Sequence, residues 1–359
     1  MTVKTPNDSV VPSGSLILVT GPDSYIGGHI VAQLLERGYR ARGAVLSISK
    51  DKWLYETFKE AHGEGKFELV EVPNMMVSNC FDEAIKGASG LIHVASPVFT
   101  SADPDVMVPI AVESTLRCLE SAVKEPRIKR VVLTASGGDM VTNVPNKVQF
   151  ISPDLWNDET VEKAYAPGPH EETMDRLKEV YYASKTLGEK AAWKFMKDNN
   201  PSFTFNAVLP CVVYGAPVDP ARQGYRIASH WIQSAFELGD AAPKYEGRYY
   251  DPQWYVDVRD NAALHIAALE YPDVVGERLP AYAGRWDWNE ILGILRRTYP
   301  GYNFGTDVTG MGQDMGTVVN ERAEELLKRL TGHGWISLED CIRDNAKWLG
   351  EQRGLKAVV

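Results

Sequence analysis

The chain has 359 residues, of which 44% are hydrophobic, and it carries a formal net charge of −10 at pH 7. This acidic balance, without any basic run, argues against nucleic acid as a partner. No apolar stretch approaches the roughly 18 residues that a membrane-spanning helix needs, and residues 1–6 lack the apolar centre of a secretion signal. The length is sufficient for one large α/β domain with a second lobe.

The cysteines lie far apart in the sequence, and no Cys-x-x-Cys pair occurs among them. This distribution is typical of free thiols in a reducing compartment and not of a disulfide framework or a zinc site. We therefore predict a cytoplasmic protein without a metal site. The residues concerned are Cys80, Cys118, Cys211 and Cys341.

After a polar start, the sequence predicts a strand, a turn, a helix and a second strand. Residues 16–19 form a short apolar run that suits a buried strand, and a turn with glycines spans residues 20–28. Residues 30–37 are apolar at helical spacing, and Gly38 follows them in the C′ position. With a second strand at residues 41–46, this order predicts a βαβ unit at the start of an α/β domain.

The turn between the first strand and its helix is a candidate site for a dinucleotide. Gly21 permits the tight turn and Gly27 permits close packing of the helix on the strand. The helix N-terminus then offers unpaired backbone N–H groups to a pyrophosphate, although glycine is also favoured in turns that bind nothing. We expect cofactor contacts from Gly21, Asp23, Ser24, Tyr25, Ile26 and Gly27.

The alternation of strands and helices continues along the chain. Further strands are expected at residues 67–72, 90–95 and 130–136, with a helix at residues 105–124. Continuous apolar strands that alternate with helices predict a parallel sheet covered on both faces. Ligands bind such sheets beyond the carboxyl ends of the strands, where Ser96 and Ser136 are found. His93 lies within a strand and is interpreted as a core residue.

Tyr181 and Lys185 are four residues apart in a predicted helix at residues 172–199, so they share one face of that helix. The lysine ammonium can favour the phenolate and lower the phenol pKa from its ordinary value of about 10. A tyrosine tuned in this way can give a proton to a carbonyl oxygen. The spacing is also common on solvated helix faces, so its context decides between the two interpretations.

Taken in order, the motifs of the chain resemble those of the extended short-chain dehydrogenases/reductases. They are Thr20-Gly21-x-x-x-Tyr25-Ile26-Gly27, His93-Val94-Ala95-Ser96-Pro97, Val131-Val132-Leu133-Thr134-Ala135-Ser136, Tyr181-x-x-x-Lys185, Leu209-Pro210 and Val256-Asp257-Val258-Arg259-Asp260. The resemblance is strongest to fungal NADPH-dependent aldehyde and ketone reductases, which are relatives of plant dihydroflavonol reductase. The segments most similar to the red-yeast carbonyl reductases are Glu189-Lys190-Ala191-Ala192-Trp193-Lys194-Phe195-Met196, Asn206-Ala207-Val208-Leu209-Pro210 and Trp286-Asp287-Trp288-Asn289. The resemblance covers about residues 15–345.

The resemblance implies a Rossmann-type doubly wound parallel sheet with a smaller, mostly helical C-terminal lobe for the substrate. Ser136 would hydrogen-bond the substrate carbonyl, Tyr181 would protonate its oxygen, and Lys185 would lower the tyrosine pKa and hold the ribose. NADPH would supply the hydride, with NADH left open. Further cofactor contacts are expected from Lys50, Asn74, Met75, Ala95, Ser96, Pro97, Lys185, Pro210 and Val213, and substrate contacts from Val98, Gly137, Tyr214 and Trp231.

The expected domains are a polar tail at residues 1–14, a Rossmann domain at 15–210 and 251–271, and a substrate lobe at 211–250 and 272–359. Within the lobe, proline and glycine surround one helix at residues 227–238, and residues 254–269 are expected to form a short strand and a helix that rejoin the sheet domain. The segment between the catalytic serine and tyrosine, residues 145–172, is too interrupted for a long helix. It is expected to form a surface excursion beside the cleft.

Several positions at the cofactor site depart from the pattern of the family. Ser24 replaces a usual glycine, and Pro22 replaces a usual alanine or serine. Leu46 stands where the subgroup often has an arginine for the 2′-phosphate of NADPH, and Asn74 stands where an aspartate commonly holds the adenine. Lys50 remains as a partner for the 2′-phosphate, and no acidic residue after the second strand indicates NAD.

These departures leave more than one function open. Backbone N–H groups can do most of the phosphate binding, in which case the chain reduces a small-molecule carbonyl compound, as a monomer or a homodimer. Alternatively, the cofactor serves a non-redox reaction such as epimerisation, dehydration or cyclisation, or the protein is a non-catalytic dinucleotide sensor. The intact Ser136, Tyr181 and Lys185 favour the reductase.

Two features next to Ser136 have consequences for the substrate. Gly137 and Gly138 carry no side chains, which predicts room for a bulky or cyclic ketone. Asp139 is interpreted as a turn cap or a solvated side chain, with a second acid–base role as the alternative.

Overall fold

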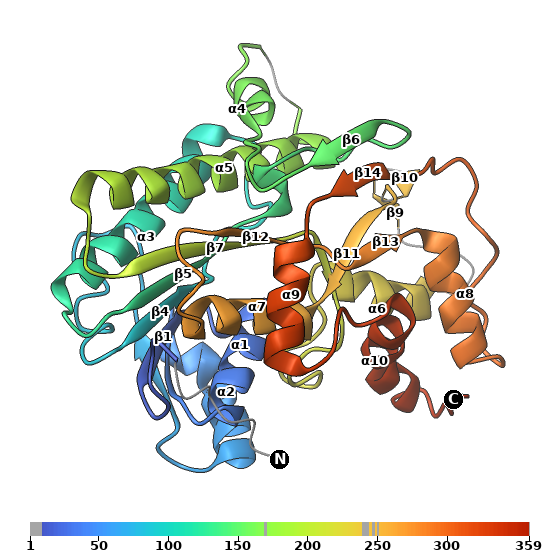
Figure 1. Ribbon diagram of the computed structural model, residues 1–359. Coiled ribbons are helices and arrows are strands. Elements are labelled where there is room, and N and C mark those ends of the chain that lie inside the picture. Colours follow the sequence, from blue (N-terminus) through green and yellow to red (C-terminus); the bar gives the residue numbers. More distant parts are fainter. Residues whose placement is uncertain (1–8, 169–170, 239–243, 246–247, 250, 359) are drawn as a thin grey trace. The chain divides into compact units, whose positions relative to one another are not determined.

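The computed structural model describes residues 9–168, 171–238, 244–245, 248–249 and 251–358. The chain forms two compact units, whose elements are labelled in Figure 1. Unit 1 comprises Met1–Thr142, Pro153–Leu209 and Ala262–Leu279, and unit 2 comprises Asn143–Ser152, Pro210–Asn261 and Pro280–Val359.

Unit 1 is built on a seven-stranded sheet with the strand order β12-β7-β5-β4-β1-β2-β3. The strands are β1 (Leu16–Thr20), β2 (Arg40–Val45), β3 (Phe67–Glu71), β4 (Gly90–His93), β5 (Arg130–Thr134), β7 (Thr204–Pro210) and β12 (Arg278–Ala281). The pairs from β3 through β7 are parallel, and every residue of β1 and β5 is buried. The Rossmann-type α/β fold predicted from continuous apolar strands is confirmed. Chain order reverses between β1 and β4, which is where such sheets bind ligands.

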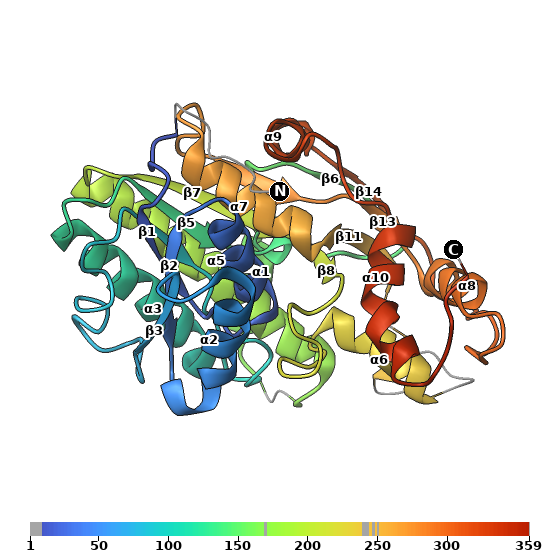
Figure 2. The same ribbon diagram turned by 90° about the horizontal axis from the view of Figure 1, so that it is seen from below.

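Helices cover both faces of this sheet. They are α1 (Tyr25–Glu36), α2 (Ile48–His62), α3 (Pro104–Lys124), α5 (Met174–Asn199) and α7 (Val258–Glu270), while α4 (Asp158–Ala164) packs on α5. Figures 1 and 2 show α3 and α5 side by side on one face, with α1 and α2 on the other. Gly188 of α5 faces α3, where a Cβ would make ordinary contact with the Ala111 carbonyl oxygen at 3.4 Å.

Helix α5 is tied to the sheet by a buried ion pair. The Glu189 carboxylate accepts two hydrogen bonds of 2.8 Å from the Arg278 guanidinium of β12, and a third of 3.0 Å from the Trp193 indole. The same guanidinium stacks 3.9 Å from the centre of the Trp156 ring and donates to the Leu155 carbonyl oxygen at 2.7 Å. This charge pair therefore helps to set the position of α5 along the sheet.

Unit 2 has small sheets and an aromatic core. Its strands are β6 (Val148–Ile151), β8 (Val212–Tyr214), β9 (Lys244–Tyr245), β10 (Arg248–Tyr249), β11 (Gln253–Asp257), β13 (Gly284–Trp286) and β14 (Met315–Val318), and its helices are α6 (Ala228–Leu238), α8 (Trp288–Thr298), α9 (Glu321–Thr331) and α10 (Leu338–Glu351). Strands β13, β11 and β8 form one sheet, and β6 pairs in parallel with β14. The core includes Tyr214, Phe236, Trp286, Trp288 and Phe304.

The unit boundaries differ from the predicted domains in ways that strand pairing explains. Residues 143–152 belong to unit 2 because β6 pairs with β14. The sequence predicts that residues 254–269 form a strand and a helix that rejoin the sheet domain. The strand, β11, instead pairs with β8 and β13 in unit 2, whereas the helix belongs to unit 1 from Ala262 onward. Residues 272–279 lead into β12 and belong to unit 1.

The predicted polar tail lies outside the described residues as far as residue 8, but its remainder is packed on unit 1. The Val10 N–H donates to the Glu270 carbonyl oxygen at 3.0 Å, and Val11 is completely buried. Gly38 has a positive φ of 86° directly after α1, in agreement with the helix end expected there.

We predict that Glu270→Ala lowers the free energy of unfolding by about 3–5 kcal/mol, because it removes the partner of a buried cation. The Glu270 carboxylate accepts hydrogen bonds of 2.8 and 2.6 Å from the Arg37 guanidinium and one of 3.1 Å from the Tyr39 hydroxyl. Urea denaturation measures the change. Glu83→Ala, which breaks the exposed pair with Lys86, is the control and should cost at most about 1 kcal/mol. Equal effects of the two variants would contradict the prediction.

Candidate active site

The three expected catalytic residues all lie in unit 1, at the carboxyl end of β5 and on α5. Ser136 follows β5 and begins a single 3-10 turn, η1 (Gly137–Asp139). Tyr181 and Lys185 lie one helical turn apart on α5, as their spacing predicts. Their elements are the ones that the parallel sheet brings to its ligand-binding edge.

The loop after Ser136 is closed by two reciprocal hydrogen bonds. The Gly138 N–H donates to the Ser136 hydroxyl oxygen at 3.1 Å, and the Ser136 N–H donates to Oδ2 of Asp139 at 3.0 Å. Asp139 is completely buried, so it is a turn cap and not a solvated side chain. Burial and the nearby Glu189 raise the pKa of the Asp139 carboxyl well above its ordinary value, while Lys185 and Arg278 act against this.

Burial is the main influence on the Tyr181 hydroxyl. It raises the pKa of Tyr181 above the ordinary value, Asp139 and Tyr182 act in the same direction, and a hydrogen bond with Ser136 lowers it. The sequence suggested that the charge of Lys185 is the dominant influence on the Tyr181 pKa. The Lys185 Nζ instead donates to the Thr134 carbonyl oxygen at 2.7 Å. The predicted effect of the lysine on the tyrosine pKa is therefore not the leading one.

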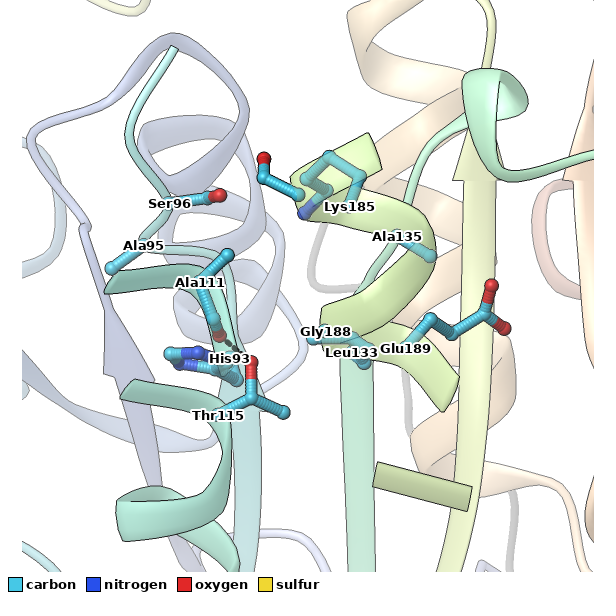
Figure 3. Close-up of a pocket in the computed structure, with 11 residues that line it drawn as sticks. His93, Ala95, Ser96, Ala111, Thr115, Leu133, Ala135, Lys185, Gly188 and Glu189 are labelled. Carbon is cyan, nitrogen blue, oxygen red and sulfur yellow. Dashed lines mark hydrogen bonds between the residues drawn. The ribbon is translucent and has the colours of Figure 1, made fainter. Parts of the chain in front are cut away.

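Lys185 lines a small pocket with Ser96 (Figure 3). The lining residues are His93, Ala95, Ser96, Ala111, Thr115, Leu133, Ala135, Ser184, Lys185, Gly188 and Glu189. Burial lowers the pKa of Lys185, although Asp139 and Glu189 raise it. The Ser96 hydroxyl points across the pocket toward Lys185, and among the described residues it has no hydrogen-bond partner although it is buried. A ribose hydroxyl is one group that would satisfy it.

The turn after β1 is tight and is joined closely to the start of α1. Gly21 has a φ of 63°, and a Cβ at Gly27 would lie 2.1 Å from the Gly21 carbonyl oxygen. Ser24 caps α1, because its hydroxyl oxygen accepts the Gly27 N–H at 3.1 Å and its hydroxyl donates to the Gly21 carbonyl oxygen at 2.6 Å. The serine that replaces a family glycine therefore stabilises the turn instead of blocking it.

The remaining cofactor candidates of unit 1 surround the same end of the sheet. Leu46 and Lys50 are exposed, just after β2 and in the first turn of α2. Asn74 follows β3 and accepts the Met76 N–H at 3.0 Å through its side chain, so its amide shapes the local turn. Tyr25 and Ile26 are the first residues of α1, and Asp23, Met75, Ala95, Pro97 and Val98 lie in the turns after β1, β3 and β4.

The other predicted contacts belong to unit 2. Tyr214 is completely buried in the aromatic core of that unit, where its ring lies 5.4 Å from the Trp286 ring and 6.1 Å from the Trp231 ring. Trp231 is only partly buried. Pro210 ends β7 and Val213 lies in β8, half-buried. The structure thus assigns a core role to Tyr214 that its sequence position did not indicate.

Tyr182 and Phe99, which lie beside Ser136 and Tyr181, change the expected shape of the site. A Cβ at Gly138 would lie 2.1 Å from the Tyr182 ring, so the space expected there for a bulky ketone is filled by that ring. Phe99, which sequence analysis missed, packs edge-on against Tyr181 with ring centres 4.8 Å apart. Its backbone has a positive φ of 49°, which is unusual for a bulky residue and has no local sequence signal.

Neither a metal-binding cluster of side chains nor a membrane-spanning helix occurs in the part of the chain that the structure describes. No cluster of His, Cys, Asp or Glu side chains within it is arranged to hold a metal ion. None of its helices combines the length and the apolar character needed to cross a membrane.

Comparisons with known proteins agree with this geometry. Residues 17–279 match the NAD dependent epimerase/dehydratase family. The chain is 38% identical to aldehyde reductase 2 of Sporidiobolus salmonicolor, and the match covers 94% of this chain and 97% of that protein. It is 35% identical to the NAD-dependent epimerase/dehydratase terH of Aspergillus terreus, over the same shares of the two chains. The yeast methylglyoxal/isovaleraldehyde reductase Gre2, solved with NADPH, is similar in structure with a TM-score of 0.79 and 25% identity, covering 94% of this chain and 99% of that one.

We predict that the buried His93 makes the protein less stable in acid. Its Nδ1 lies 2.8 Å from the Thr20 hydroxyl oxygen, and burial, followed by the charge of Lys185, lowers the pKa of His93 to about 3. Below the unfolded-state pKa of about 6.5, the unfolded chain binds a proton that the folded chain does not, so stability falls as the pH falls. Between pH 7 and pH 5 we expect a loss of about 2 kcal/mol through this residue.

Urea denaturation at both pH values tests this expectation. His93→Asn keeps a polar atom near Thr20 and should remove that part of the acid sensitivity, whereas the exposed His230→Asn should leave it unchanged. An identical acid response in all three proteins would mean that His93 does not control it.

Proposed function

The chain belongs to the NAD-dependent epimerase/dehydratase family, and we propose that it is an NADPH-dependent reductase of aldehydes or ketones. The observation that carries the proposal is the placement of Ser136, Tyr181 and Lys185 at the same sheet edge as the glycine turn after β1. Two hydroxyl groups and a lysine beside a dinucleotide turn are the parts needed to polarise and protonate a carbonyl group. The names of the relatives, an aldehyde reductase among them, support the same chemistry.

The protein side of the reaction follows from its hydrogen bonds. The Ser136 oxygen accepts the Gly138 N–H, and its hydroxyl is hydrogen-bonded with Tyr181, so a substrate carbonyl oxygen would take the serine hydrogen in place of Tyr181. Tyr181, whose raised pKa keeps it protonated at neutral pH, donates the proton as the oxygen becomes an alkoxide. Lys185 is held by the Thr134 carbonyl oxygen and retains N–H groups for ribose hydroxyls.

The cofactor-binding residues fit a dinucleotide. The backbone N–H groups at the N-terminus of α1, which Ser24 caps, would bind the pyrophosphate. Ser96 and Lys185 line the pocket expected for the nicotinamide ribose. When bound, NADPH supplies the hydride. The relative Gre2 was solved with NADPH, which supports this cofactor over NADH. In this chain Lys50, exposed in the first turn of α2, is the cation proposed for the 2′-phosphate.

Tyr181→Phe removes the proton donor, and we predict that it lowers kcat/KM for carbonyl reduction by about 100-fold or more. NADPH affinity should remain unchanged, because the phenol is not among the groups proposed to hold the cofactor. The measurements are the oxidation of NADPH with a panel of aldehydes, α-ketoesters and aryl ketones, and a fluorescence titration of NADPH. Tyr182→Phe removes the neighbouring hydroxyl and is the matched control. Full activity in Tyr181→Phe would rule out the assigned proton donor.

Lys50→Ala should weaken NADPH binding about three- to tenfold at low ionic strength while leaving NADH binding unchanged, because only NADPH carries the 2′-phosphate. Lys52→Ala alters an exposed lysine of the same helix and serves as the control. Equal losses for the two cofactors, or no loss for either, would place the 2′-phosphate against other groups.

A non-redox reaction on the same scaffold is the second candidate. It is favoured by the match to terH, which is named an epimerase/dehydratase, together with Ser24, Leu46 and Asn74 at the cofactor site. A protein of this kind binds NADPH but oxidises it with no carbonyl compound of the panel. Turnover of NADPH that depends on Tyr181 decides for the reductase.

A further inference from the structure

The loop that carries Ser136 is held by hydrogen bonds with Asp139 and Asn157, to which the proposed reaction assigns no step. Asp139 Oδ2 accepts the Ser136 N–H at 3.0 Å, while the Ser136 oxygen accepts the Gly138 N–H at 3.1 Å. The first bond fixes the serine backbone, and the second fixes which lone pair of its hydroxyl oxygen is occupied. The hydroxyl hydrogen takes no part in either bond and remains a donor.

Asn157 holds the same loop from the chain segment that follows. Its Nδ2 donates to the Gly138 carbonyl oxygen at 2.8 Å and to the Thr142 hydroxyl oxygen at 3.0 Å. Its backbone N–H donates to the Asp139 carbonyl oxygen at 2.8 Å. Asn157 also caps α4 through Oδ1, which accepts the Thr160 N–H at 3.3 Å. The segment expected to be a surface excursion is thus bonded to the catalytic loop.

The loop also abuts the helix that carries the proposed acid. The Tyr182 ring fills the position where a side chain at Gly138 would be, and Tyr182 is the direct neighbour of Tyr181. A shift of the Ser136 loop would therefore change its distance from Tyr181. Acid–base catalysis by two hydroxyl groups on one oxygen is sensitive to such shifts, since displacements of about 1 Å can cost about 100-fold in rate.

Asp139 is suited to this task in its neutral form. It is completely buried, and its Oδ1 has no hydrogen-bond partner among the described residues. The charged groups that act on it are Lys185, Glu189 and Arg278, of which the last two are paired with each other. Burial raises the pKa of its carboxyl, and a neutral carboxyl still accepts the Ser136 N–H. An asparagine can make the same bond without any charge.

We propose that Asp139, supported by Asn157, is a positioning residue that orients the Ser136 hydroxyl toward the substrate carbonyl. This inference rests on the proposed reductase function. Asp139 touches neither substrate nor cofactor in this scheme, and its hydrogen bond acts on the reaction through Ser136. Its removal therefore matters only while the Ser136 hydroxyl is present.

A double-mutant cycle tests this dependence. Asp139→Ala should lower kcat about 10- to 100-fold with a smaller change in KM, because the lost interaction acts mainly in the transition state. Asp139→Asn should recover most of that loss by accepting the Ser136 N–H. In the Ser136→Ala background, adding Asp139→Ala should cost less than about twofold.

The control is Asp287→Ala, which removes a carboxylate that likewise caps a backbone N–H, that of Glu290 at 2.9 Å, at the start of α8. It should leave the kinetics of the folded protein unchanged. Should Asp139→Ala fail to fold, Asn157→Asp performs the same cycle, because it keeps the α4 cap and loses the donor to the Gly138 carbonyl oxygen.

The outcomes separate the two proposals. A wild-type protein that reduces no carbonyl compound overturns the reductase function, and the role of Ser136 with it. An active wild type with an unimpaired Asp139→Ala variant overturns only the role of Asp139. Equal losses from Asp139→Ala with and without the Ser136 hydroxyl, or a failure of Asp139→Asn to restore activity, overturn it as well.

Discussion

The buried ion pair between Glu189 and Arg278 is the constraint on which the candidate site depends. It joins α5, which carries Tyr181 and Lys185, to the edge strand β12 of the sheet, with side-chain exposures of 0% and 9%. Two charges this deeply buried are stable only as a pair, so the position of the helix cannot relax without exposing or separating them. Glu189 lies one helical turn beyond Lys185. The ion pair with Arg278 therefore fixes where Tyr181 and Lys185 lie along the helix axis relative to the end of β5.

The site combines rigid and locally shaped parts. The sheet sets the positions of Ser136 and of the turn after β1. Hydrogen bonds between nearby residues then set the local conformation of the Ser136 loop and of that turn. Ser24, which departs from the family pattern, caps helix α1 by accepting the Gly27 N–H. The buried carboxyl of Asp139 holds the Ser136 loop by accepting the Ser136 N–H. Burial of Tyr181 and Lys185 moves their pKa values in opposite directions, toward the neutral form of each. The chemistry of the site is thus set by burial as much as by charge.

The sequence predicted strands β1 to β5 of the large sheet, helices α1, α3 and α5, and the alignment of Tyr181 with Lys185, because these follow from local apolar periodicity. It did not predict that β12 belongs to that sheet, because residues 272–359 were expected in the substrate lobe. It did not predict that β6 pairs with β14 or that β11 leaves the large sheet, since pairing between distant segments leaves no local pattern. Helix α2 was missed because only Leu54 and Phe58 of its residues are buried. The packing of Phe99 on Tyr181 and of Tyr182 on Gly138 depends on tertiary contacts and could not be read from spacing.

The division of unit 1 into three chain segments also affects how the protein is made. Its last segment, Ala262–Leu279, supplies both Arg278 and β12, and it follows an excursion of the chain through unit 2. A nascent chain that has already emerged as far as α5 still lacks the partner of the buried Glu189. The helix with the proposed catalytic tyrosine can settle only after most of the polypeptide has left the ribosome, and until then an unpaired carboxylate and an uncovered sheet edge are exposed to chaperones and proteases.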